Sequence, residues 1–157
     1  MPCVMLLMNI MEELNSHKYL YLDKLFEESD LELCILVDEA KVQSDEPADL
    51  ENASLYAAIV SDSTCRKYKI IFENYIAYSV RNESYTVPDD EEEFTGSLYR
   101  VYAKSRFLDY VAASTVGVEH VAGAYKHYGI VCLNHVIDVA GSREPSIEII
   151  GTAIGDD

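Results

Sequence analysis

The chain has 157 residues, about the size of one ordinary domain, and 49% of them are hydrophobic, which excludes a largely disordered protein. Acidic residues outnumber basic ones by 28 to 12, which gives a net charge of −16. Proteins neutralise nucleic-acid phosphates and anionic lipids with Lys and Arg, so we expect neither nucleic acid nor a membrane as a partner. The charge favours a basic protein as the partner.

The first third of the chain predicts a helix and two strands before a polar stretch. Apolar residues at helical spacing predict a helix over residues 4–14, which Asn15 can end. Strands are predicted over residues 19–22 and 33–37, and the second of these is a short apolar run typical of a buried strand. Residues 40–54 are rich in acids and turn formers, so we expect an acidic loop there.

From residue 55 the chain is rich in Tyr, Ile and Val, which suits strands. The predicted strands cover residues 56–60, 68–72, 75–80, 99–104, 127–132, 136–140 and 147–150. Alternation within 75–80 predicts that Ile76, Tyr78 and Val80 point inward. Ser105 is a suitable N-cap for one helix that ends by residues 114–117, and a turn is expected at residues 133–134.

These elements predict the fold class and the domain organisation. Strands that follow one another in the chain usually pair, so we expect an α+β fold. Its core is mainly an antiparallel sheet of about six strands, with two helices packed on one face. One domain spans residues 1–157, and residues 55–150 are its best supported core.

The four cysteines show no spacing typical of a metal site or a redox site. Cys3, Cys34, Cys65 and Cys132 lie far apart, and none forms a CxxC motif or a close Cys/His pair. The sequence also lacks phosphate-binding glycine loops. We therefore expect a cytoplasmic protein with reduced thiols, no metal and no cofactor.

The twelve tyrosines and an acidic run give the candidate surface for a partner. The run consists of Asp89, Asp90, Glu91, Glu92 and Glu93. Tyrosine suits protein interfaces because its ring is apolar and its hydroxyl is polar. Tyr85 and Tyr102 stand next to polar residues at strand positions that we expect to face outward, so we predict that they bind the partner.

A second candidate site is a pocket near Glu83, His127 and His135. Glu83 lies in a polar cluster, where burial would raise its pKa and make it an acid or base. If the chain turns at residues 133–134, His127 and His135 lie at opposite ends of a hairpin, so they are not expected to bind one metal ion. No nucleophile motif is present, and no catalytic residue is assigned.

Three segments carry a resemblance to a known group of proteins. They are residues 78–85 (YSVRNESY), 105–110 (SRFLDY) and 127–139 (HYGIVCLNHVIDV). In these segments the chain resembles a group of small, acidic bacterial proteins with no assigned activity, and the resemblance covers about residues 56–150. Such proteins are similar to immunity proteins, which block a partner toxin by binding it, and the resemblance implies no catalytic residues.

Three hypotheses for the function follow. The leading one is stoichiometric binding of a basic protein, for example the neutralisation of a toxin domain, with acidic steering and tyrosine anchors. The alternative is a small-molecule-binding or enzymatic domain that uses the pocket. The third is an inhibitor whose rows of acids imitate DNA phosphates. The residues favour a binding protein over an enzyme, and they do not predict an oligomeric state.

Overall fold

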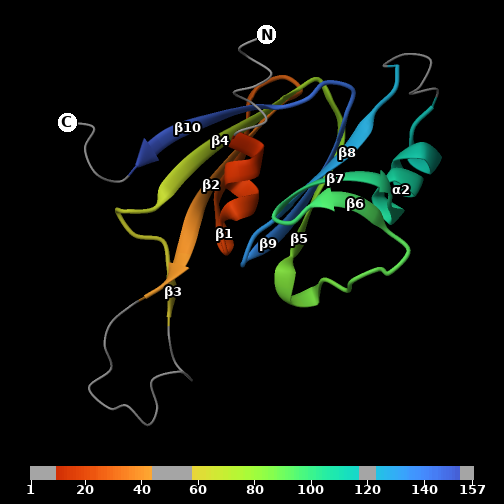
Figure 1. The fold of residues 1–157 in the computed structure, drawn as a ribbon. Coiled ribbons are helices and arrows are strands. Elements are labelled where there is room, and N and C mark those ends of the chain that lie inside the picture. Colours follow the sequence, from red (N-terminus) through yellow and green to blue (C-terminus); the bar gives the residue numbers. More distant parts are fainter. Residues whose placement is uncertain (1–9, 44–57, 117–122, 153–157) are drawn as a thin grey trace.

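The fold is a two-layered β structure, seen here in a computed structural model that describes residues 10–43, 58–116 and 123–152 (Figure 1). The described residues form ten strands in two five-stranded sheets, and all strand pairs are antiparallel. The α+β class and the antiparallel pairing are confirmed. The expected number of about six strands in one sheet is wrong.

The first sheet has the strand order β1-β2-β4-β10, and β3 pairs with the end of β2. Its strands are β1 (Tyr19–Ser29), β2 (Glu32–Val42), β3 (Ile59–Val60), β4 (Arg66–Glu73) and β10 (Ser146–Thr152). The second sheet has the order β5-β9-β8-β7-β6. Its strands are β5 (Tyr75–Asn82), β6 (Glu93–Gly96), β7 (Tyr99–Lys104), β8 (Lys126–Val131) and β9 (His135–Gly141).

Two stretches of chain, β4–β5 and β9–β10, each run from one sheet into the other and connect the sheets. β4 continues into β5 through the single residue Asn74, whose φ of 51° lies in the left-handed region that Asn tolerates better than most residues. β9 continues into β10 through residues 142–145, and β10 pairs with β4 as β9 pairs with β5. A bent pair of long strands therefore belongs to both sheets, and this holds the sheets together.

One apolar core lies between the sheets. Alternate residues of β2 and β4 meet alternate residues of β8 and β9 there. The main members are Leu33, Ile35, Val37, Tyr68, Ile70, Phe72, Tyr128, Ile130, Ile137 and Val139. The rings of Phe72 in the first sheet and Tyr128 in the second lie 5.5 Å apart. The core therefore requires both sheets, so we treat the described residues as one folding unit.

The N-terminal helix closes one side of this core. Residues 10–16 are helical, Leu14 is fully buried, and Ile10 and Met11 pack against the core. The Oδ1 of Asn15 accepts hydrogen bonds from the backbone N–H groups of residues 97, 98 and 99, at 2.9–3.0 Å. Asn15 thus lies near the end of the helix, as predicted, and it also attaches the helix to the turn between β6 and β7. Residues 4–9 of the predicted helix lie outside the described residues.

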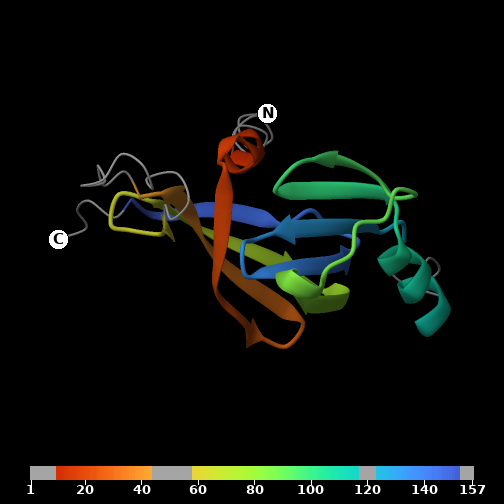
Figure 2. The same cartoon turned by 90° about the horizontal axis from the view of Figure 1, so that it is seen from below.

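The second helix, α2 (Arg106–Ser114), covers the other face of the second sheet. Ser105 is its N-cap, as predicted, and its Oγ accepts the N–H of Leu108 at 3.0 Å. The N-terminal helix and α2 lie on different sides of the molecule (Figure 2). The prediction that both helices pack on one face is therefore wrong, because the second sheet buries both of its faces.

Three predicted details need correction. β6 was missed because its sequence, EFTG, is too short and polar to give a strand signal. Tyr78 and Val80 of β5 are exposed rather than inward. β5 is an edge strand of the second sheet, and it has a bulge between Tyr75 and Ala77. Of the predicted acidic loop 40–54, residues up to Val42 belong to β2. Residues 44–54 lie outside the described residues.

Candidate functional site

A chain of four polar side chains lies under α2, on the second sheet's face opposite the core. The Oγ of Ser105 lies 2.7 Å from the Nδ1 of His127, and the Nε2 of His127 lies 2.7 Å from the Oδ1 of Asp138. Arg81 donates to the other carboxylate oxygen of Asp138 at 3.0 Å. Ser105, His127 and Asp138 are at most 3% exposed, whereas the Arg81 side chain is 48% exposed.

Strand register brings these residues together. Gly129 of β8 is opposite Asp138 of β9, so His127, two residues before Gly129, shares the face of Asp138 and is its diagonal neighbour. Ser79 is opposite Asp138 on β5, and Arg81 follows two residues later on the same face. Ser105 arrives from the end of β7, because it caps α2 above this face.

Aromatic rings enclose the imidazole of His127. The Tyr102 ring stacks on it with centroids 4.0 Å apart and an interplanar angle of 9°, and the Phe107 ring lies 4.9 Å away. Gly129 makes this possible, because a Cβ there would lie 2.7 Å from the Cε2 of Tyr102. Burial raises the pKa of the Tyr102 phenol. The imidazole therefore packs against two aromatic rings and is only 1% exposed.

The residue types match a Ser-His-Asp triad, but the arrangement does not support nucleophilic catalysis. Ser105 is buried, and its Oγ already accepts the Leu108 N–H of the helix cap. Its remaining polar contact is with the Nδ1 of His127, and the Nε2 of the same ring contacts Asp138, so the hydroxyl already has two partners inside the protein. A substrate cannot reach a 2% exposed hydroxyl, so we interpret the chain as a support that holds Arg81 in place.

Arg81 lines a crevice formed by β5, α2 and residues 86–92. Among the described residues the crevice contains two cavities, of about 490 and 400 Å³. Arg81, Glu92 and Arg106 line both cavities. Arg106 begins α2, and its Nε lies 2.8 Å from the Oδ2 of Asp89. Volumes of this size are in the range of small-molecule sites.

The predicted acidic run is an ordered loop rather than a free charge block. Asp89 pairs with Arg106, and its Oδ1 accepts the N–H of Glu91 at 3.0 Å. Glu92 lines the crevice, and Glu93 begins β6 opposite Lys104. The outward-facing members of the run are Asp90, Glu91 and Glu93.

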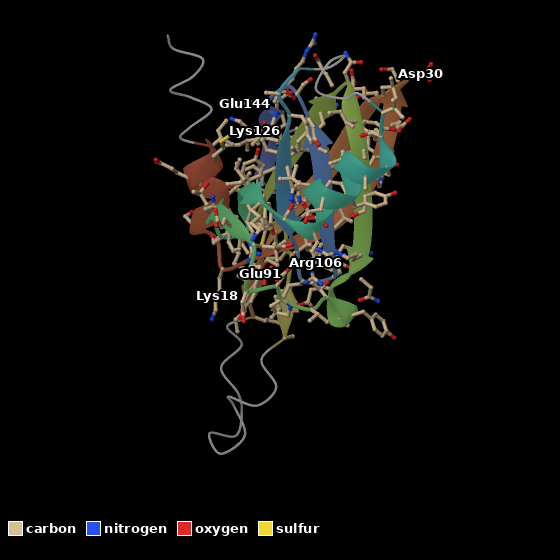
Figure 3. All side chains as sticks on the ribbon, turned by 90° about the vertical axis from the view of Figure 1, so that its right-hand side faces the viewer. Lys18, Asp30, Glu91, Arg106, Lys126 and Glu144 are labelled. Carbon is tan, nitrogen blue, oxygen red and sulfur yellow. The ribbon has the colours of Figure 1, made fainter. Side chains whose placement is uncertain are left out.

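The β1–β2 hairpin also carries acidic residues, away from this run. Asp30, at the tip of the β1–β2 hairpin, lies at the opposite end of the molecule from Glu91 (Figure 3). The tip of the β1–β2 hairpin and the acidic run therefore lie apart on the surface.

The two predicted tyrosine anchors differ in exposure. Tyr85 ends the short 3₁₀ helix η1 (Glu83–Tyr85) and is 85% exposed. Tyr102 is only 6% exposed, because its ring covers Gly129 and His127. The expectation that Tyr102 faces outward is therefore wrong. The ring of Phe94 in β6, with its centroid 5.1 Å away, also packs against this tyrosine.

The predicted pocket residues do not line one cavity. Glu83 lines the 490 Å³ cavity and lies near the β8–β9 turn, where its N–H donates to the carbonyl of Asn134 at 3.3 Å. His135 begins β9 beside this turn, whereas His127 lies at the far end of the hairpin, as expected. Neither histidine lines either crevice cavity. The Nδ1 of His135 is buried and has no hydrogen-bond partner among the described residues.

The polar chain itself was not predicted, although the sequence carries one signal for it. His127 and Asp138 interrupt two apolar strands, and polar residues at such positions are usually hydrogen-bonded to each other when buried. The sequence does not show that the two residues are neighbours, because their pairing depends on the exact position of the β8–β9 turn.

Comparisons with known proteins give no further assignment: no family model matches the chain, and neither curated proteins nor solved structures gave a match. Within the described ranges, no group of three or more His, Cys, Asp or Glu residues is placed to hold a metal ion. In the part of the chain that the structure describes, no helix is long and apolar enough to cross a membrane.

Proposed function

We propose that the protein acts by stoichiometric binding of a basic protein, through a surface that we name the loop patch. The loop patch consists of Tyr85, Val87, Asp90, Glu91 and Glu93. The observation that carries the proposal is the exposure of two large apolar side chains, Tyr85 at 85% and Val87 at 69%, beside outward-facing carboxylates. An apolar anchor with a charged rim is typical of protein interfaces.

The loop patch is held in position before any partner arrives. Arg106 pairs with Asp89 at 2.8 Å and lies 3.4 Å from the carbonyl of Val87, so α2 fixes the loop from behind. The Oδ1 of Asn82 accepts the N–H of Ser84 at the start of η1. A surface that is already ordered loses less conformational entropy on binding, which favours affinity.

The charge of the chain supports a basic partner. The net charge of −16 repels polyanions and raises the rate at which a cationic protein meets the surface. We further propose that the partner is a toxin domain that this protein neutralises, which rests on the resemblance of residues 56–150 to immunity-protein-like bacterial proteins. The proposed mechanism is occlusion of the partner, so it requires no catalytic residue in this chain.

The test begins with capture and ends with kinetics. The immobilised protein is exposed to a lysate of the cells that produce it, and the captured basic protein is identified and purified. Association and dissociation rates are then measured at two ionic strengths. We expect kon to fall steeply with salt, because screening shortens the range of the steering field. A salt-independent kon argues against acidic steering.

Variants locate the interface. Tyr85→Ala should raise koff, and Tyr21→Ala, at an exposed tyrosine of β1, is its matched control. Glu91→Gln should lower kon more than Asp30→Asn does, because the two carboxylates lie at opposite ends of the molecule (Figure 3). If Tyr85→Ala changes koff no more than Tyr21→Ala does, or Glu91→Gln changes kon no more than Asp30→Asn does, the interface lies outside the loop patch.

A further inference from the structure

We propose that the crevice between β5, α2 and residues 86–92 binds a small zwitterion of the amino-acid class. Such a molecule carries a carboxylate, an ammonium group and an apolar side group. This site goes beyond the proposed protein binding. The residues that argue for it are not those of the loop patch, and the two sites adjoin where Val87 and Asp90 line the 490 Å³ cavity. Three features carry the inference: two supported arginines, a carboxylate that lines the same two cavities, and aromatic rings beside them.

Arg81 is the best supported cation of the crevice. Its partner Asp138 is held by His127, and His127 is held by Ser105, so three buried residues fix one half-exposed guanidinium. A buried polar chain is costly to build compared with apolar packing, so such a chain is expected where a side chain must be positioned. Arg81 gives one N–H to Asp138 and retains further donors at the two cavities.

Arg106 lines the same two cavities from the opposite element. Asp89 engages its Nε, and the carbonyl of Val87 accepts from its Nη2 at 3.4 Å, which leaves Nη1 and the second N–H of Nη2 for a ligand. Two guanidinium groups at one cavity match the geometry of a carboxylate, because each presents paired donors in a plane.

The charge balance selects a zwitterion over an anion. Asp138 neutralises Arg81, and Asp89 neutralises Arg106. Glu92 lines both cavities, and its carboxylate has no ion-pair partner within the described ranges. The 490 Å³ cavity is also lined by one further cation, Arg100, and two further acids, Glu83 and Asp90, so its charged side chains carry a net negative charge. The crevice therefore favours an ammonium group beside the ligand carboxylate, and the net charge of −16 further disfavours polyanions such as nucleoside phosphates.

The apolar side group has a surface to contact. Phe107 and Tyr110 of α2 line the 400 Å³ cavity, and their rings lie 6.3 Å apart. Phe107 also contacts the ring of His127, so its position is fixed by the same buried cluster that holds Arg81. A planar or branched apolar group of amino-acid size fits this wall.

The test uses L-phenylalanine as the probe, with three comparators. Phenethylamine lacks the carboxylate, 3-phenylpropionate lacks the ammonium group, and inorganic phosphate is an anion without an apolar part. Each is titrated into isotopically labelled protein, and backbone amide shifts are followed by NMR. We expect saturable shifts in α2, β5 and residues 86–92 with L-phenylalanine, and binding roughly ten-fold weaker or more for each comparator, the size expected for one lost charge-assisted hydrogen bond.

Two variants separate the roles of the charged groups. Arg106→Gln should weaken L-phenylalanine roughly ten-fold and leave phenethylamine unchanged. Glu92→Gln should weaken L-phenylalanine and leave 3-phenylpropionate unchanged. Arg143→Gln, at an exposed arginine that pairs with Glu73, is the matched control and should change nothing. Neither crevice variant removes a buried side chain, so the amide spectrum of each should show a folded protein.

Clear outcomes overturn the proposal. The absence of saturable shifts with L-phenylalanine, or shifts confined to other elements, would exclude the zwitterion site. Equal affinity for L-phenylalanine and 3-phenylpropionate would exclude the role of Glu92. Neither result bears on the loop patch, because its test uses Tyr85 and a protein partner.

Discussion

The two faces of the second sheet differ in what they bury, and β9 shows the difference within two consecutive residues. Ile137 points into the apolar core between the sheets, where its contacts are aliphatic and aromatic. Asp138 points to the opposite face, where it is equally buried but hydrogen-bonded to His127 and Arg81.

The comparison separates two uses of burial. The face toward the core gains stability through the hydrophobic effect, which requires no particular orientation of its groups. The face under α2 gains less, because each polar group must first lose its water. What that face provides is orientation: each of its groups has a fixed partner, and the last of them, Arg81, opens onto the crevice.

Ile137→Ala tests the core face and should have the largest effect on stability. Removing three buried methyl or methylene groups costs about 2–5 kcal/mol in the free energy of unfolding, because transfer energy is lost and a cavity remains. Urea denaturation followed by circular dichroism measures this loss. A cost under about 1 kcal/mol would mean that the core between the sheets is loosely packed.

Asp138→Asn tests the face under α2 and should cost about 1–3 kcal/mol, less than Ile137→Ala. The asparagine amide keeps the volume and one acceptor for His127, but it loses the charge that pairs with Arg81. The released guanidinium is half-exposed, so water compensates part of the loss. The same denaturation measurement applies, with Asp90→Asn at an exposed carboxylate as the control. If Asp138→Asn equals or exceeds Ile137→Ala, the polar chain is a main source of stability.

The alkaline limb of stability tests the core face through its phenols. Burial raises the pKa of Tyr128 to about 12, and burial also raises the pKa of Tyr99. A hydrogen bond to Glu27 raises the pKa of Tyr75 to about 12. In the unfolded chain these phenols titrate near the ordinary value of about 10.

The sign follows from proton linkage. As the pH rises from about 10 to about 12, the unfolded state loses protons that the folded state retains, so the free energy of unfolding falls. Below about pH 10 these groups contribute no pH dependence. Urea denaturation at a series of alkaline pH values measures the fall. Phenolate absorbance should show the core tyrosines Tyr99 and Tyr128 ionising only when the protein unfolds. Ionisation of Tyr99 and Tyr128 near pH 10 in folded protein would contradict this description of the core.

The strands of the core face were largely predictable from the sequence, and the architecture was not. Local signals place a strand at residues 33–37 and cap a helix at Ser105, because apolar runs and cap residues act over a few neighbours. The bend at Asn74, which divides the strands between two sheets, depends on pairing between β4 and β10, which are about eighty residues apart.

The candidate site was predictable only in part, for the same reason. Tyr85 and the acidic run belong to one local stretch of chain, and the sequence identifies them as polar and exposed. The chain from Ser105 to Arg81 joins four elements, β5, the start of α2, β8 and β9, whose register is set by long-range pairing. Tyr102 lies on the face away from the core, as alternation predicts, but it is buried because alternation does not indicate that other side chains cover this second face.

A substitution in the loop patch should have the smallest effect on the free energy of unfolding, in contrast to substitutions on either face of the sheet. Tyr85→Ala should change the free energy of unfolding by no more than about 0.5 kcal/mol, because an 85% exposed ring loses little contact when it is removed. Tyr128→Ala, at a core tyrosine 2% exposed, is the matched comparison and should cost several kcal/mol, as other large core truncations do. Thermal and urea denaturation of the two variants measure the pair. A cost for Tyr85→Ala near that of Tyr128→Ala would mean that the ring stabilises the fold. Such a result would remove the reason to assign an exposed aromatic side chain to a partner. A neutral Tyr85→Ala variant that also raises koff for the basic partner would assign the residue to binding, since its exposure then has no role in folding.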